Sequence, residues 1–214
     1  MKGIRNIIFD LGGVVIDLAR DNAVRALDKL GIHDASTLLG EYEQKGPFLQ
    51  LEKGEISTSE LFDMLLPLCK PGTKSTDIRD AFEEFLVEIP TERLLEIRKL
   101  RDAGYRVFVL SNTNPIMYNH WIDEKFRSEG LTINDYFDGI VVSFQERLCK
   151  PDPQIFLNLI KRYRLNPSET LMLDDSEANC HGARAAGLKT IQVRKEGEDS
   201  FMEICRRLLE KKDF

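Results

Sequence analysis

Short apolar runs bounded by polar or turn-forming residues recur along the 214-residue chain. Five of these runs are as short and as continuously apolar as strands that are covered on both faces of a parallel sheet. We therefore expect strands at residues 6–10, 106–111, 139–143, 170–174 and 190–193. A sheet built from such strands is buried between two layers of helices.

Patterns with a helical period lie between the predicted strands. The stretch 91–103 carries an apolar stripe and precedes Gly104, a residue type that is common just after a helix. Further helices are predicted at about 152–164, with Pro153 in the first turn, and at about 177–186. This alternation of strands and helices predicts an α/β fold with a Rossmann-like, doubly wound parallel sheet.

The stretch from residue 17 to residue 88 has a different pattern. It holds helical patterns at 20–30, 58–68 and 76–86 and no convincing strand, and residues 71–75 are predicted to form a surface loop. We expect a core formed by residues 1–16 and 89–214, with a small helical cap, residues 17–88, inserted after the first strand. Residues 46–48, which include Phe48, and the segment 51–57 are candidates for the cap surface that faces the site.

Composition and charge exclude several classes of function. The formal net charge is −6, and the basic residues are scattered among acidic ones, so the chain lacks the basic face that nucleic acids and anionic membranes require. No run approaches the roughly 20 apolar residues of a membrane span, and no secretory signal is evident. Four distant cysteines without a CxxC motif suggest reduced thiols. We expect a cytoplasmic protein, either a monomer or a homodimer.

Polar residues that could take part in catalysis or ligand binding follow the predicted strands at their carboxyl ends. They are Asp10 after the first strand, Ser111 and Asn112 at the second, Lys150 shortly after the third, and Asp174 and Asp175 at the fourth. Parallel strands bring these ends to one edge of the sheet, where ligands bind. Each residue alone is commonly a turn former or a helix cap. Together they supply what phosphoryl transfer to a carboxylate requires: a nucleophile, groups that bind phosphate and acidic ligands for Mg²⁺.

Four segments together resemble the motifs of the haloacid dehalogenase superfamily. They are FDLGGV at 9–14, LSN at 110–112, KP at 150–151 and LDDS at 173–176. The resemblance spans nearly the whole chain and includes a cap after the first motif, in which LEKGEIS at 51–57 is similar to a segment of such caps. Within the superfamily, the chain resembles most closely a branch that contains α-D-glucose-1-phosphate phosphatase. The resemblance implies a Mg²⁺-dependent phosphatase acting on a small phosphorylated metabolite.

The resemblance also implies a role for each motif residue. Asp10 would attack phosphorus and ligate Mg²⁺, and the backbone carbonyl of Gly12 would be a second ligand. Asp175 would coordinate the metal, while Asp174 would support it or hold a water bound to it.

The remaining motif residues are expected to bind the phosphate. Ser111 and the backbone of Asn112 would contact phosphate oxygens. Lys150 would neutralise both the phosphate and the carboxylate of Asp10.

One position departs from the family's pattern. Typical phosphatases of this family carry an aspartate two residues after the nucleophile, where it acts as general acid, but this chain has Gly12. A positioned general acid is typically worth about 10²- to 10⁴-fold in rate. The chain is thus a phosphatase whose proton comes from a metal-bound water or a cap residue, or a catalytically weak or inactive binding protein. A dehalogenase is a third interpretation, against which the Asp174–Asp175 pair argues.

Two further expectations follow. Without a strong general acid, esters with more acidic leaving groups should be favoured, so sugar 1-phosphates should be hydrolysed faster than sugar 6-phosphates. A phosphorelay receiver is a further alternative, because it also combines an acceptor aspartate, an acidic pair and a lysine. In a receiver the acidic pair comes first in the chain, whereas here it comes last, and this order argues against a receiver.

The histidines and Cys149 have more ordinary interpretations. His33, His120 and His181 show no spacing typical of a metal site or catalytic triad, and structural roles are favoured, although His120 follows the second motif and is a candidate for substrate contact. Cys149 is expected to be a packed thiol.

Overall fold

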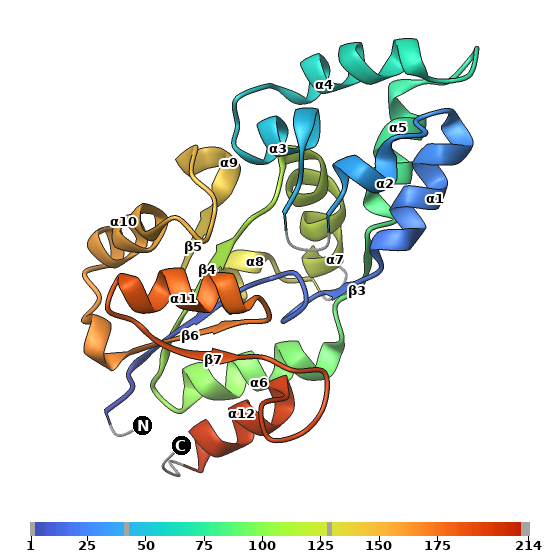
Figure 1. The fold of residues 1–214 in the computed structure, drawn as a ribbon. Helices are drawn as coiled ribbons and strands as arrows, with labels where there is room; N and C mark the ends of the chain where they lie inside the picture. Colours follow the sequence, from blue (N-terminus) through green and yellow to red (C-terminus); the bar gives the residue numbers. More distant parts are fainter. Residues whose placement is uncertain (1–2, 41–42, 128–129, 211–214) are drawn as a thin grey trace.

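The computed structural model describes residues 3–40, 43–127 and 130–210. Its core is a five-stranded parallel sheet with the strand order β5-β4-β1-β6-β7 (Figure 1). The strands are β1 (Asn6–Phe9), β4 (Arg106–Ser111), β5 (Gly139–Val142), β6 (Thr170–Asp174) and β7 (Lys189–Gln192). All five predicted strands are present, with ends that differ by at most one residue, and the predicted fold class is confirmed.

Successive residues of the central strand β1 point to opposite faces of the sheet. Ile7 and Phe9 pack in a cluster that includes residues of α6 (Thr91–Asp102) and α12 (Phe201–Leu209). Ile8 packs in a second cluster with residues of α10 (Pro153–Tyr163) and α11 (Glu177–Ala185). Figure 1 shows these two helix layers on either side of the sheet. The strands are therefore apolar throughout because both of their faces are buried.

The predicted core helices are present, and the sequence reasoning missed others. The patterns at 91–103, 152–164 and 177–186 correspond to α6, α10 and α11. The C-terminal helix α12 was not predicted. Shorter core helices in the described residues are the π-helical η2 (Met117–Ile122), α7 (Asp123–Arg127), α8 (Ile133–Tyr136), α9 (Ser143–Glu146) and the 3₁₀ helix η3 (Pro167–Glu169).

Helices make up most of residues 17–88. They are α1 (Arg20–Leu30), α2 (Ala35–Leu38), α3 (Gly46–Glu52), α4 (Thr58–Leu65), η1 (Leu66–Leu68) and α5 (Ser75–Glu83). The predicted helix 20–30 is matched by α1, 58–68 by α4 with η1, and 76–86 by the shorter α5. A capping box starts α4: Ser57 accepts a hydrogen bond from the Glu60 backbone, and the Glu60 carboxylate accepts one from the Ser57 backbone.

The expectation that residues 17–88 contain no strand is wrong at both ends. Asp17–Leu18 (β2) and Leu86–Glu88 (β3) form an antiparallel pair where the chain leaves and re-enters the core. Strands of two and three residues are too short for a periodic pattern, and their pairing depends on the fold that brings them together. The division into core and cap stays a prediction, and its outermost bounds, residues 1 and 214, lie outside the described residues.

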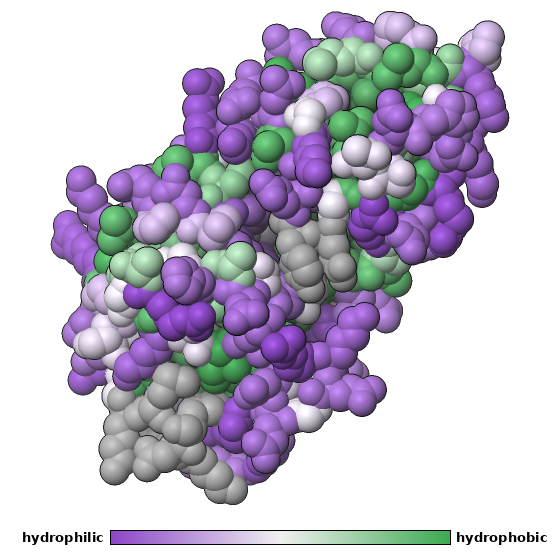
Figure 2. All heavy atoms as spheres, in the orientation of Figure 1, coloured by the Kyte–Doolittle hydropathy of each residue, from purple (hydrophilic) through white to green (hydrophobic). Residues whose placement is uncertain are grey.

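The helices of the cap bury apolar side chains that belong to the same cluster as Ile7 and Phe9 of β1. Phe48 is buried and stacks on Phe82 with ring centroids 4.9 Å apart. Phe48 therefore packs between α3 and α5, and the hypothesis that it lies on the cap surface facing the site is wrong. The face of the molecule drawn in Figure 2 is predominantly hydrophilic over the cap helices and the core helices alike.

Candidate active site

The loop after β1 fixes the position of Asp10. The carbonyl oxygen of Leu11 accepts hydrogen bonds of 2.8 Å from the backbone of both Val15 and Ile16, so the chain turns back on itself directly after the strand. The backbone N–H of Leu11 also donates to Oδ1 of Asp10 at 2.7 Å. One carboxylate oxygen of Asp10 is thus held by the loop, and the other is directed to the neighbouring motifs.

The ammonium group of Lys150 lies between the ends of β1 and β6 and pairs with a carboxylate from each. Its Nζ lies 2.9 Å from Oδ2 of Asp10 and 2.7 Å from Oδ2 of Asp174. The backbone of Lys150 is fixed by Asn112, whose side chain accepts from the Lys150 N–H at 2.8 Å and donates to its carbonyl at 2.9 Å. Because the lysine side chain is fully buried, it acts as an internal cation between two carboxylates.

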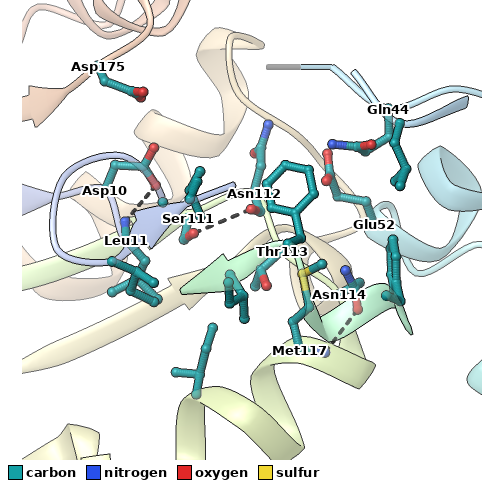
Figure 3. Close-up of a pocket in the computed structure, with 18 of the residues that line it drawn as sticks. Asp10, Leu11, Gln44, Glu52, Ser111, Asn112, Thr113, Asn114, Met117 and Asp175 are labelled. Carbon is teal, nitrogen blue, oxygen red and sulfur yellow. Dashed lines mark hydrogen bonds between the residues drawn. The ribbon is translucent and has the colours of Figure 1, made fainter. Parts of the chain in front are cut away.

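Asp174 and Asp175 differ in their environment. Asp174 is completely buried, and its Oδ1 accepts hydrogen bonds from the Ser176 N–H at 2.9 Å and the Asn179 side chain at 3.0 Å. The carbonyl of Asp175 accepts from the Gln192 side chain at 2.8 Å, which anchors its backbone beside β7. The side chain of Asp175 is only partly buried and lines a cavity, as Figure 3 shows.

Three carboxylates converge at the edge of the sheet. One oxygen from each of Asp10, Asp174 and Asp175 lies within 4.8 Å of the others. Burial raises the pKa of Asp10 to about 8, and the two other aspartates add to the effect while Lys150 opposes it. Burial alone would lower the pKa of Lys150, but Asp10 and Asp174 hold it above its ordinary value. Negative charge therefore exceeds positive charge in this cluster, as in a site for a cation.

The end of β4 contributes hydroxyl and amide groups. Ser111 is buried, and its hydroxyl makes only a long contact of 3.4 Å with the Asn112 carbonyl. The backbone of Thr113 is held by Ser143, which accepts from its N–H at 3.0 Å and donates to its carbonyl at 2.9 Å. Asn114 caps the next helical segment by accepting two hydrogen bonds of 3.1 Å from backbone N–H groups. The segment after β4 is therefore rigid beside the Ser111 hydroxyl.

A cavity opens above these groups and is covered by the cap (Figure 3). Polar residues on its walls are Asp10, Gln44, Glu52, Ser111, Asn112, Thr113, Asn114, Asp175 and Asn179. Apolar residues on its walls are Leu11, Ile16, Leu18, Leu39, Phe82, Phe85, Leu86, Met117 and Ile122. Gln44 and Glu52 belong to the segment around α3, so the cavity combines polar groups from the sheet edge with polar groups from the cap.

Comparison with known proteins assigns the family. Residues 4–187 match the family described as haloacid dehalogenase-like hydrolase. The chain belongs to this family. The resemblance inferred from the four motifs is thereby confirmed.

Two relatives within the haloacid dehalogenase-like family are informative. D-ribitol-5-phosphate phosphatase of Bacteroides thetaiotaomicron is 41% identical over 189 residues, which are 88% of this chain and 91% of that protein. A family enzyme of the same species, crystallised with magnesium and inorganic phosphate, has a TM-score of 0.84 at 33% identity and covers 94% of this chain and 99% of its own. These relatives do not confirm the resemblance to the glucose-1-phosphate branch.

A third similar protein is a haloacid dehalogenase-like hydrolase from Porphyromonas gingivalis. Its structure has a TM-score of 0.81 and 37% identity to this chain, and it covers 88% of this chain and 90% of its own.

Among the residues that the structure describes, none of the helices is long and apolar enough to cross a membrane.

All residues that the motifs predict for the site lie together at this edge of the sheet. They are Asp10, Gly12, Ser111, Asn112, Lys150, Asp174 and Asp175. Their individual roles stay predictions. Sequence reasoning missed Gln44 and singled out Glu52 only as part of the segment 51–57.

The other candidates of the sequence analysis lie apart from these groups. His120 bonds to the carboxylate of Glu83 at 2.9 Å and is not among the residues that line this cavity, which fits the favoured structural role, and its contact with substrate stays a prediction. His33 bonds to Asp28 at 2.7 Å. All four cysteines are free thiols, and burial raises the pKa of Cys149 to about 12, as expected for a packed thiol.

Proposed function

We propose that this protein is a Mg²⁺-dependent phosphatase that hydrolyses a small phosphate monoester through an aspartyl-phosphate at Asp10. The observation that carries the proposal is the pairing of Asp10 with the buried ammonium of Lys150 at 2.9 Å, inside a cluster of three carboxylates. The similarity to a D-ribitol-5-phosphate phosphatase and to a structure with magnesium and inorganic phosphate supports it.

The donor set fits Mg²⁺. Three carboxylates against one ammonium leave an excess of negative charge in a buried place, and carboxylate and carbonyl oxygens are the ligands that Mg²⁺ prefers. Asp10, Asp175 and the carbonyl of Gly12 would hold the ion, with Asp174 in support. When bound, Mg²⁺ would supply positive charge to the phosphate oxygens and to the carboxylate cluster.

The chain's own residues carry out the remaining parts of the phosphoryl transfer. Asp10 attacks phosphorus with its carboxylate oxygen and displaces the alcohol. Lys150 neutralises charge on Asp10, which its Nζ contacts at 2.9 Å, and on the phosphate that becomes bonded to Asp10. Ser111 and the backbone of Asn112 donate hydrogen bonds to the phosphate oxygens, which accumulate charge in the transition state.

The cavity favours a small polar substrate. Gln44 and Asn114 provide amide groups for hydroxyls, and Leu39 and Phe82 provide apolar wall, as a sugar or polyol phosphate requires. The name of the ribitol-5-phosphate relative favours the primary phosphate of a polyol. The expected preference for sugar 1-phosphates stays a prediction, as do the cytoplasmic location and the monomeric or homodimeric state.

Turnover of a substrate panel tests the proposal. p-Nitrophenyl phosphate, ribitol 5-phosphate, glucose 1-phosphate and glucose 6-phosphate are assayed with Mg²⁺ or EDTA, for the wild type, Asp10→Asn and the control Asp17→Asn. We expect metal-dependent turnover that Asp10→Asn abolishes and Asp17→Asn retains, because Asp17 pairs with Arg93 outside the carboxylate cluster.

A catalytically inactive binding protein is the second candidate, and the observation that favours it is Gly12 in place of a general acid. A wild type that binds Mg²⁺ but turns over none of the four esters would support this candidate and refute the phosphatase.

A further inference from the structure

The proposed phosphatase lacks a proton donor at Gly12, and among the described residues one side chain on the cavity wall can replace it. Among the described residues on the cavity wall, the carboxyl groups are Asp10, Asp175 and Glu52. Asp10 and Asp175 belong to the carboxylate cluster. Glu52 is the remaining carboxyl group, and it is contributed by the cap.

Glu52 and its neighbouring residues pack closely against the core. Glu52 is the last residue of α3 and is 7% exposed. Two residues later Gly54 has a φ of +63° and lies so close to the carbonyl of Phe144, in α9, that a Cβ there would overlap its oxygen. The Cys149 thiol lies 3.8 Å from the Glu52 carboxylate, which places Glu52 beside the residue that precedes Lys150.

Glu52 also approaches the site from the required direction. In phosphoryl transfer the attacking and leaving oxygens lie roughly in line with phosphorus. Asp10 attacks from the end of β1, so the leaving oxygen is directed away from the sheet, towards the cap. Figure 3 shows Glu52 on the opposite side of the labelled residues from Asp10, with Ser111 and Asn112 between them.

The charge state of Glu52 is suitable for an acid. Burial raises its pKa to about 7, while the Cys149 contact and Lys150 oppose the shift, Glu43 adds to it and Lys53 opposes it. These are the charged and titratable groups that influence it from α3 and its flanks and from the segment before α10. A carboxyl group with this pKa carries its proton over much of the neutral range and can return to that state between turnovers.

We propose that Glu52 is the general acid and base of this enzyme, which donates a proton to the leaving oxygen in the first step. This inference rests on the proposed phosphatase function. The Asp10 oxygen forms a bond to phosphorus, the bond from phosphorus to the ester oxygen breaks, and its electron pair takes the Glu52 proton to give the alcohol. A water molecule then attacks phosphorus, returns a proton to Glu52 and releases Asp10 and inorganic phosphate.

The dependence on the leaving group tests Glu52. p-Nitrophenolate leaves without protonation, whereas an alkoxide does not, so Glu52→Gln should affect the two classes of ester differently. Ethyl phosphate is the alkyl probe because it has no further hydroxyl for the cap to recognise. We expect Glu52→Gln to lower kcat/KM on ethyl phosphate by about 10²- to 10⁴-fold and to leave kcat/KM on p-nitrophenyl phosphate nearly unchanged, because kcat/KM reports only the steps up to the phosphorylation of Asp10.

Two controls accompany the assay. Glu83→Gln removes another buried cap carboxylate, which bonds to His120 instead of lining the cavity, and both activities should be retained. In the wild type, kcat/KM for ethyl phosphate should fall as the pH rises through about 7, and Glu52→Gln should lack this fall.

Each alternative outcome is distinguishable. Equal losses of kcat/KM on both esters, or no loss of kcat/KM on either, would overturn the role of Glu52 as acid. A loss confined to KM for ribitol 5-phosphate, with ethyl phosphate unaffected, would overturn it and assign Glu52 to binding substrate hydroxyls. Absence of turnover by the wild type on every ester would refute the proposed function itself, whereas wild-type turnover of p-nitrophenyl phosphate keeps that function whatever Glu52 does.

Discussion

The Nζ atom of Lys150 lies 2.7 Å from Oδ2 of Asp174, and both side chains are completely buried. Removing one partner of a buried ion pair leaves an uncompensated charge, which typically destabilises a protein by about 3–5 kcal/mol. We expect Lys150→Met to lower the free energy of unfolding by this amount in EDTA at neutral pH and to abolish phosphatase turnover. Urea unfolding followed by circular dichroism measures the stability.

Lys161→Met is the control for Lys150→Met, because it removes an exposed lysine from α10. Its effect should stay within about 0.5 kcal/mol, as for other surface substitutions. Mg²⁺ should restore part of the stability of Lys150→Met by neutralising the carboxylate cluster. A Lys150→Met protein as stable as the wild type in EDTA would show that the cluster needs no internal cation.

The buried carboxyl of Glu52 predicts a pH-dependent stability. Its pKa is raised from 4.5 to about 7, so the folded protein keeps a proton there that the unfolded chain releases. The stability from this group is fully present below pH 4.5 and is lost as the pH rises through about 7. A shift of this size corresponds to about 3 kcal/mol at most, taking 1.36 kcal/mol for each pKa unit.

Glu52→Gln removes this titration. The free energy of unfolding of the variant, minus that of the wild type, should therefore rise between pH 5 and pH 8, by up to about 3 kcal/mol. Asp10 titrates in both proteins and cancels in this difference. Urea unfolding in EDTA at several pH values measures it, and a difference that stays constant with pH would mean that Glu52 is ionised in the folded protein throughout.

The sequence predicted the sheet and the residues at its edge because both depend on local patterns. Buried parallel strands are recognisable as apolar runs, and the fold itself brings their carboxyl ends together, so Asp10, Ser111 and Asp174 needed no knowledge of tertiary contacts. The β2–β3 pair was missed because two or three residues carry no periodic pattern. Its existence depends on distant parts of the chain meeting.

The sequence could not predict which residues of the cap reach the site. Nothing in the residues around Glu52 indicates that its carboxylate reaches the Cys149 thiol, because that contact depends on how α3 packs against α9. Phe48 was expected on the cap surface facing the site, yet its large apolar ring is buried against Phe82 of α5. Amphipathic patterns indicate which residues are buried but not which neighbouring helix buries them.

The approach of Gly54 to Phe144 predicts the cost of a methyl group at the junction of cap and core. Gly54→Ala must both strain a left-handed backbone and displace the Phe144 carbonyl. We expect a loss of stability well above the roughly 1 kcal/mol of the backbone strain alone. We also expect at least a tenfold loss of kcat/KM on alkyl phosphates, since Glu52 moves with this segment. Thermal unfolding and steady-state kinetics measure the two effects.

Gly72→Ala provides a matched control for the backbone term. Gly72 has a φ of +89°, but a Cβ there would meet nothing within 4 Å. Gly72→Ala should therefore show the backbone strain without a steric clash, and it should leave kcat/KM unchanged. If both alanine variants lost the same stability and kept full activity, the contact between Gly54 and Phe144 would be unimportant for docking the cap.

Gly12 and Gly13 form a second matched pair, at the carboxylate cluster. Gly13 has a φ of +72°, and a Cβ there would overlap the carboxylate of Asp175. A Cβ on Gly12 would meet only the flexible end of Leu18, at 3.1 Å, and the backbone carbonyl that is expected to ligate the metal would remain. Gly13→Ala should therefore displace Asp175 and weaken Mg²⁺ binding by about 10- to 100-fold, the range seen when metal ligands lose their support. Gly12→Ala should bind Mg²⁺ nearly as the wild type does. Isothermal titration calorimetry with Mg²⁺ measures both affinities, and circular dichroism establishes that each variant is folded. Equal affinities of the two variants would contradict the assignment of Asp175 as a ligand, because only Gly13→Ala moves its carboxylate.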